Sequence, residues 1–146
     1  MPASVPERGA ERAAVAADAS ARLGGRSVVL AAVLDLVLVL VFVGIGRRSH
    51  DEGEAFLGFL TTAWPFVAGA ALGWLLVRAW QRPLRVVPTG AVVWIAAVMG
   101  GMLLRLASGQ GVQLSFVVVT AVVLGVFLVG WRGIAALVRR MRARRR

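Results

Sequence analysis

The sequence predicts an all-α membrane protein in which four transmembrane helices form an up-and-down antiparallel bundle with both termini in the cytoplasm. Three observations support this fold class. Apolar residues make up 59% of the 146-residue chain and charged residues only 16%, whereas charged residues are about 25% of a typical soluble domain. Four apolar stretches are each long enough to cross a bilayer. The basic residues gather on one side of those stretches.

Each of the four apolar stretches contains 19 to 23 residues, and a helix of about 20 apolar residues crosses a hydrocarbon core of about 30 Å. Connectors of eight residues join them. Because such short connections make sequential helices antiparallel neighbours, we expect an up-and-down bundle. The predicted spans are residues 27–46, 55–77, 86–104 and 113–131, with connectors at 47–54, 78–85 and 105–112.

Arginine supplies all 17 basic residues of the chain. Fourteen of them lie in residues 1–26, 78–85 and 132–146, and three lie in the other two connectors. By the positive-inside rule, the segments that are richer in arginine stay in the cytoplasm. The distribution therefore predicts that both termini are cytoplasmic and that the protein lies in a bacterial inner (plasma) membrane.

The two ends outside the spans differ in character. Residues 1–26 are rich in alanine and poor in bulky apolar side chains, so we expect a disordered or interfacial segment. In residues 132–146, apolar side chains recur at helical spacing among arginines. This pattern predicts an amphipathic extension of the fourth helix that binds anionic lipid headgroups. The lipid-binding residues of this tail are Arg139, Arg140, Arg142, Arg144, Arg145 and Arg146.

Small residues recur at helical spacing in the last three spans. They allow helix backbones to approach closely, which matters in lipid because burial of apolar groups gives no net attraction there. The expected packing residues are Gly58, Gly69, Gly73, Ala97, Gly101 and Gly125. Pro65 cannot donate a backbone hydrogen bond to the carbonyl of Thr61, so we expect a kink in the second span.

Asp35 is the only charged residue in the four predicted spans. As the ninth residue of its span, it is predicted to lie near the middle of the bilayer. Side chains at similar depth in the other spans are candidates for a polar layer around it: Thr61, Thr62, Trp94 and Thr120. One hypothesis is that this layer relays protons or cations, or anchors a polar ligand. The other is that Asp35 is a neutral acid whose hydrogen bonds only fix helix packing.

The first connector holds the only histidine, His50, near Arg47, Arg48 and Asp51. Both a pH-sensitive or cation-binding patch and an ordinary solvated loop fit this composition. On the same predicted outer face, Arg105 extends the small-residue face of the third span, and we expect its side chain to reach the outer headgroups.

The residues that most enzyme classes need are missing. The chain has no cysteine and one histidine, which excludes disulfides, thiol catalysis and histidine-rich metal sites. The sequence contains neither a nucleophile beside a base nor a phosphate-binding glycine loop. We therefore expect no enzyme activity, no cofactor and no bound metal.

Several of these residues together resemble a known family. The most specific part is the Gly-Arg-Arg-Ser-His stretch from Gly46 to His50, which follows the mid-span Asp35 and Phe42. With Trp64, Pro65, Phe66 and Gly69, and then Gly101 and Arg105, the chain resembles a family of small bacterial and archaeal membrane proteins known as domain of unknown function 3054. The resemblance covers residues 27–131. It implies four membrane spans and brings no assigned activity.

Two classes of function fit such a multi-pass membrane protein. The first is a small transporter or proton-conducting protein that works through Asp35. Since four spans leave little room for a pathway, this class predicts a homo-oligomer. The second is a non-catalytic accessory or scaffold subunit that binds partner helices of another membrane protein and anionic lipid. Nucleic acid is not an expected partner, because membrane topology and lipid attraction account for the arginines.

Overall fold

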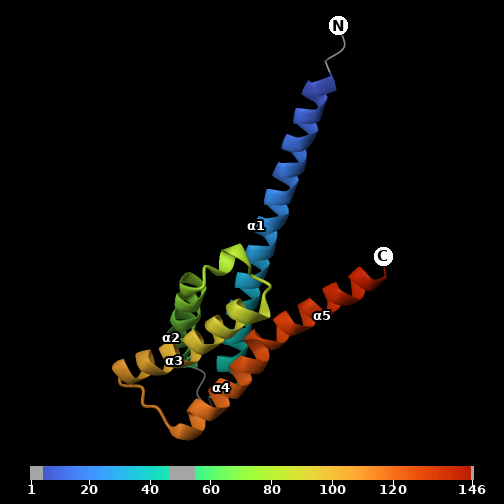
Figure 1. The fold of residues 1–146 in the computed structure, drawn as a ribbon. Helices are drawn as coiled ribbons and strands as arrows, with labels where there is room; N and C mark the ends of the chain where they lie inside the picture. Colours follow the sequence, from blue (N-terminus) through green and yellow to red (C-terminus); the bar gives the residue numbers. More distant parts are fainter. Residues whose placement is uncertain (1–4, 47–54, 146) are drawn as a thin grey trace.

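The computed structural model describes residues 5–46 and 55–145, and in these ranges the chain is helical without any β-strand (Figure 1). Four helical segments are long and apolar enough to cross a membrane. The predicted all-α, four-span fold class is therefore confirmed, and the protein is a multi-pass membrane protein. The candidate spans are Gly9–Gly46, Phe56–Leu76, Val86–Ala107 and Leu114–Arg144.

Helix α1 (Val5–Gly46) has 42 residues, which corresponds to roughly 63 Å at 1.5 Å per residue. Its N-terminal part projects away from the bundle, and its C-terminal part packs against α2 and α4 (Figure 1). An exposed ion pair joins Asp18 to Arg22 at 2.8 Å within the projecting part. From Val5 onward, the alanine-rich segment that precedes the first predicted span continues that span as one helix.

A short connector joins α2 (Ala55–Leu76) to the third span. It starts at Arg78, whose φ of 48° is left-handed and ends the α-helical path. One 3₁₀ turn, η1 (Ala79–Gln81), comes next. The kinked segment η2 (Val86–Gly90), in which Val87 is extended, leads into α3 (Ala91–Ala107). Residues 78–85 therefore reverse the chain and keep α2 and α3 adjacent.

Helices α2 and α3 form the closest pair in the bundle, and glycines permit it. A Cβ atom on Gly69 would lie 2.6 Å from the carbonyl oxygen of Ala96, and one on Gly73 would lie 2.8 Å from the Cα of Val93. A Cβ on Gly101 would overlap the ring of Phe66. The predicted small-residue faces of the second and third spans therefore meet each other inside the bundle.

Aromatic side chains fill the middle of the bundle. The fully buried ring of Phe66 in α2 meets Phe42 of α1 edge-on, with ring centroids 5.5 Å apart. Its other neighbour is Phe116 of α4, at 6.1 Å. Near Gly125, Trp94 crosses from α3 and donates a hydrogen bond of 2.9 Å to the carbonyl of Ala121. These contacts bring all four spans to one core.

The fourth span and the tail are nearly one rod. Helix α4 (Leu114–Leu128) and α5 (Gly130–Arg144) are separated only by Val129, whose backbone dihedral angles are still helical. The amide of Val129 donates to the carbonyl of Gly125, and the amide of Gly133 donates to the carbonyl of Val129, both at 3.0 Å. The expected helical extension of the fourth span is α5.

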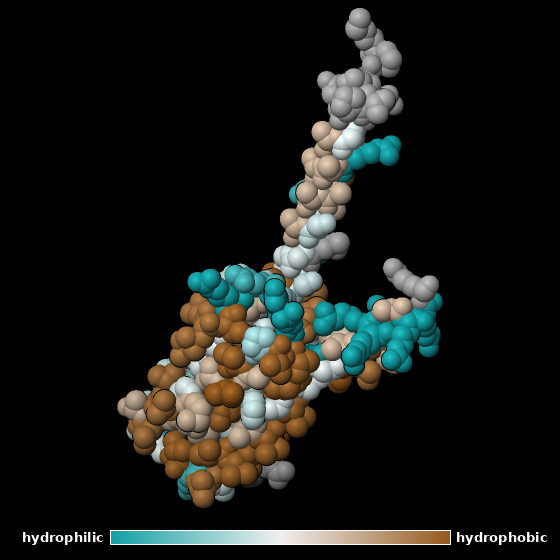
Figure 2. All heavy atoms as spheres, viewed as in Figure 1, coloured by the Kyte–Doolittle hydropathy of each residue, from teal (hydrophilic) through white to brown (hydrophobic). Residues whose placement is uncertain are grey.

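The surface divides into an apolar body and a hydrophilic end. Apolar side chains cover the bundle, and hydrophilic ones gather where α1 and α5 leave it (Figure 2). The connector between α2 and α3 lies at this same end, and both termini project from it (Figure 1). The arginine-rich segments 78–85 and 132–145 thus share one side of the bundle, which we call the arginine face.

The close approach of α2 and α3 makes Gly69 a sensitive position. Gly69→Ala is expected to lower the free energy of unfolding by about 1–3 kcal/mol, because the added methyl group would overlap the backbone of α3. Gly44→Ala is the matched control in α1, since the nearest atom, in the ring of Phe59, lies 3.9 Å from its Cβ. Alanine there should leave stability equal or higher through helix propensity. Reversible unfolding in mixed micelles measures both variants, and equal stabilities would contradict the packing.

Candidate functional site

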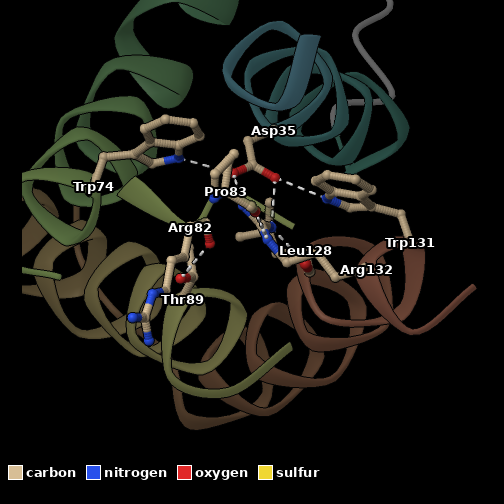
Figure 3. A network of polar contacts seen from close by, with 8 residues as sticks. All are labelled: Asp35, Trp74, Arg82, Pro83, Thr89, Leu128, Trp131 and Arg132. Carbon is tan, nitrogen blue, oxygen red and sulfur yellow. Dashed lines mark hydrogen bonds and ion pairs between the residues drawn. The ribbon is translucent and has the colours of Figure 1, made fainter. Parts of the chain in front are cut away.

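Three side chains surround Asp35, the one acid of the four predicted spans. Asp35, on α1, is only 2% exposed, and its carboxylate accepts four hydrogen bonds. Oδ1 accepts from the Nε1 of Trp131 at 2.9 Å and from Nη1 of Arg132 at 2.8 Å. Oδ2 accepts from the Nε1 of Trp74 at 2.8 Å and from Nη2 of Arg132 at 2.6 Å. Figure 3 shows the carboxylate between the two indoles with the guanidinium beside it. We call Asp35, Trp74, Trp131 and Arg132 the Asp35 cluster.

Arg132, in the first turn of α5, is fully buried. Besides its two bonds to Asp35, its Nη1 donates to the carbonyl of Leu128 at 2.8 Å and its Nε to the carbonyl of Pro83 at 3.0 Å. Its guanidinium also lies over the ring of Trp131, 4.5 Å from the centroid. A bidentate guanidinium–carboxylate pair is the strongest form of charged hydrogen bonding in proteins. The pair is thus both desolvated and nearly completely satisfied.

The start of α3 leaves room for the arginine stem. A Cβ on Gly90 would lie 3.0 Å from the Cδ of Arg132. Any larger residue there would press against the side chain that reaches Asp35. Gly90 is therefore a positioning residue for the cluster.

The connector is tied to the cluster through its backbone. Three consecutive carbonyls, those of Arg82, Pro83 and Leu84, each accept a hydrogen bond from a side chain. The donors are the hydroxyl of Thr89 at 2.9 Å, Nε of Arg132 at 3.0 Å and Nη2 of Arg139 at 3.2 Å. The side chains of Thr89 and Arg132 are buried, so they hold the connector backbone from inside the bundle (Figure 3).

The cluster does not lie where residue counting puts it. Asp35 faces Trp74, in the last turn of α2, and its partner Arg132 bonds to the connector. The cluster thus sits toward the arginine face rather than at mid-span. The physical reason is that α1 is one long helix, so the start of its apolar stretch at residue 27 does not mark the level at which it enters the bundle.

The polar layer expected around Asp35 does not form from the expected residues. The hydroxyls of Thr61 and Thr62 bond to the carbonyls of Leu57 and Gly58 in the preceding turn of α2. Pro65 is buried inside α2, which continues through it as one helix. Trp94 bonds to α4, as described above. Thr120 is fully buried, and its hydroxyl has no hydrogen-bond partner among the described residues.

At the opposite end, Arg105 turns back onto its own connector. Its Nη1 donates to the side-chain oxygen of Gln110 at 2.9 Å, and its guanidinium lies 4.8 Å from the ring centroid of Phe116. Its Nε is buried without a partner in the described part of the chain. Arg105 is therefore held by Gln110 and Phe116 at this end of the bundle. The other outer-face candidates, Arg47, Arg48, His50 and Asp51, lie outside the described residues.

The family comparison covers the whole cluster. The sequence model of the family described as "Protein of unknown function (DUF3054)" matches residues 32–135. The chain belongs to the DUF3054 family. The matched region begins three residues before Asp35 and ends three residues after Arg132, so it contains both members of the ion pair. No curated protein and no solved structure matches the chain.

A cavity lies beside the cluster of this DUF3054 protein. It has a volume of about 210 Å³ and lies between α1 and α2, lined by Ala32, Asp35, Leu36, Val39, Val67, Ala70, Ala71 and Trp74. Except for Asp35 and the indole of Trp74, the lining is aliphatic. The polar atoms at its end are already engaged with each other and with Arg132.

The sequence singles out Asp35 but not its partners. Trp131 is the last residue of the predicted fourth span and Arg132 the first residue of the tail, yet both reach Asp35 across 96 and 97 residues of sequence. A signal was present, because Arg132 is the first charge after the fourth apolar stretch. Other arginines border the spans as well, so the sequence could not choose among them.

Because the pair is buried, the two charges should depend on each other. Asp35→Asn is expected to lower the free energy of unfolding by about 3–5 kcal/mol, since it leaves a buried guanidinium without a counter-charge. The double variant Asp35→Leu with Arg132→Met removes both charges and should regain most of that loss. Denaturant unfolding in micelles measures both. If Asp35→Asn were as stable as the wild type, the ion pair between Asp35 and Arg132 would not be buried away from water.

Proposed function

We propose that this DUF3054 protein is a non-catalytic accessory or scaffold subunit of the bacterial plasma membrane, with both termini in the cytoplasm. The observation that carries the proposal is the complete engagement of the Asp35 carboxylate by four N–H donors. Because these donors hold the carboxylate in one position, we assign Asp35 a structural role, in which it links α1 to the other helices.

A relay through Asp35 needs a carboxylate oxygen that is open to a proton donor or acceptor. Each oxygen already accepts two hydrogen bonds from indole or guanidinium N–H groups, and the buried guanidinium of Arg132 has this carboxylate as its counter-charge. This geometry favours the accessory role over the proton-conducting one.

The orientation rests on charge and on the arrangement of the ends. The arginine-rich connector and the tail lie on the same side of the bundle (Figure 1), and arginine-rich segments stay in the cytoplasm. This supports a topology with both termini inside.

A partner helix would not use the glycine faces of α2 and α3, because these are occupied within the bundle. Helix α1 carries a further exposed apolar surface. Its exposed residues include Val29, Leu30, Val33, Val37 and Val41. We propose that contacts with another membrane protein form along this face.

A transporter is the second candidate, and the cavity beside Asp35 is the observation that favours it. An aliphatic cavity between α1 and α2 with a polar end offers a place for a small solute. For transport, the ion pair would have to open during each cycle, so loss of the pair would abolish the activity.

Proton flux into liposomes under an imposed pH gradient tests the accessory role against proton conduction and proton-coupled transport. The accessory role predicts that the wild type gives no flux above empty liposomes, and that Asp35→Leu with Arg132→Met gives none either. The double variant is the suitable comparison, because it is expected to stay folded and its cluster no longer contains the carboxyl group of Asp35. Flux in the wild type that disappears in a folded double variant would overturn the accessory proposal.

A further inference from the structure

A second feature of the arginine face is a pocket lined by unpaired cationic groups. It has a volume of about 480 Å³ and is bounded by α1, the connector and α5. Its lining residues are Gly24, Ser27, Trp80, Gln81, Arg82, Pro83, Leu84, Arg85 and Arg139. Three of these are arginines and none is acidic, so the pocket is a concentrated positive site.

The arginines of this pocket have no internal counter-ion. In residues 5–46 and 55–145, the ion pairs are those of Asp18 with Arg22 and of Asp35 with Arg132. The side chains of Arg82 and Arg85 are exposed and donate no hydrogen bond to another described residue. In Figure 3 the guanidinium of Arg82 points away from the Asp35 cluster. These groups are therefore available to an anion.

The pocket is also held in shape from the inside. The carbonyls of residues 82–84 are bonded to Thr89, Arg132 and Arg139, so the loop that carries two of the arginines is fixed by its backbone. Arg139 bonds to the carbonyl of Leu84 and lines the pocket from α5. A preformed cationic site loses little conformational freedom when it binds a ligand.

Position and chemistry identify the ligand. Guanidinium groups bind phosphate oxygens in bidentate geometry. The connector that carries most of the pocket lies at the hydrophilic end of the bundle (Figures 1 and 2). The half-exposed indole of Trp80, which lines the pocket, is typical of the membrane interface. We propose that this pocket binds the phosphate of an anionic phospholipid headgroup, with Arg82, Arg85 and Arg139 as its ligands. The inference is independent of the accessory role.

The test measures lipid binding to the full chain in detergent by native mass spectrometry. The probes are cardiolipin, phosphatidylglycerol and zwitterionic phosphatidylcholine. Arg82→Gln with Arg85→Gln removes two pocket charges and no described hydrogen bond. The matched control, Arg12→Gln with Arg78→Gln, removes two exposed charges that lie outside both the pocket and the tail. We expect the pocket variant to lose about tenfold or more in affinity for both anionic lipids and the control to lose less than about threefold.

Binding of phosphatidylcholine should be the same in all variants. Similar losses of affinity in both double variants would overturn the proposal, because the lipid would then respond to the overall positive charge. No loss in the pocket variant would also overturn it, because the pocket arginines would then not bind the lipid. Inorganic pyrophosphate tests the other source of phosphate: displacement of lipid by millimolar pyrophosphate would assign the pocket to a soluble anion and overturn the lipid assignment. If the double variant does not fold, Arg85→Gln alone serves the same test with about a fivefold expected loss.

Discussion

The ion pair between Asp35 and Arg132 joins α1 to α5 and the connector at the arginine face. A lone carboxylate or guanidinium in a low-dielectric interior costs several kcal/mol even after relaxation, and pairing offsets this only when the remaining polar atoms also find partners. Here the indoles of Trp74 and Trp131 and the carbonyls of Leu128 and Pro83 complete the set. Since these groups belong to different elements, complete pairing determines how α2, the connector and the junction of α4 with α5 lie around α1.

Close contacts between apolar residues hold α2 against α3. Helices α2 and α3 approach until a Cβ on Gly69 or Gly73 would collide with the facing backbone, and close dispersion contacts of this kind are the main attraction between helices in lipid. Helix α1 has no such contact, since Gly44 has only ordinary van der Waals neighbours and Gly46 has open space. Its attachment therefore relies on buried side chains such as Val39, Phe42 and Val43 and on the polar bonds of Asp35.

Composition and length were enough to predict the four spans, because a membrane imposes one scale on every apolar helix. Spacing was enough to predict that Gly69, Gly73 and Gly101 pack against other helices. The partners of Asp35 were not predictable in this way. Depth counted from the apolar boundary placed it among Thr61, Trp94 and Thr120, and the count failed because α1 extends as one helix well beyond its apolar stretch. Which arginine met the acid depended on the rotation of α5, which no periodicity encodes.

The connector shows how a buried charge can shape a surface. Its carbonyls at Arg82, Pro83 and Leu84 face the protein and accept bonds from Thr89, Arg132 and Arg139. Its guanidinium groups face outward and make no described bond. The central carbonyl is held by Arg132, and Arg132 is held in place by Asp35. Asp35 on α1 therefore positions the guanidinium of Arg132, and Arg132 in turn positions the connector that bears Arg82 and Arg85. A change that breaks the buried pair should release the loop and spread its charges, even though no pocket residue has been altered.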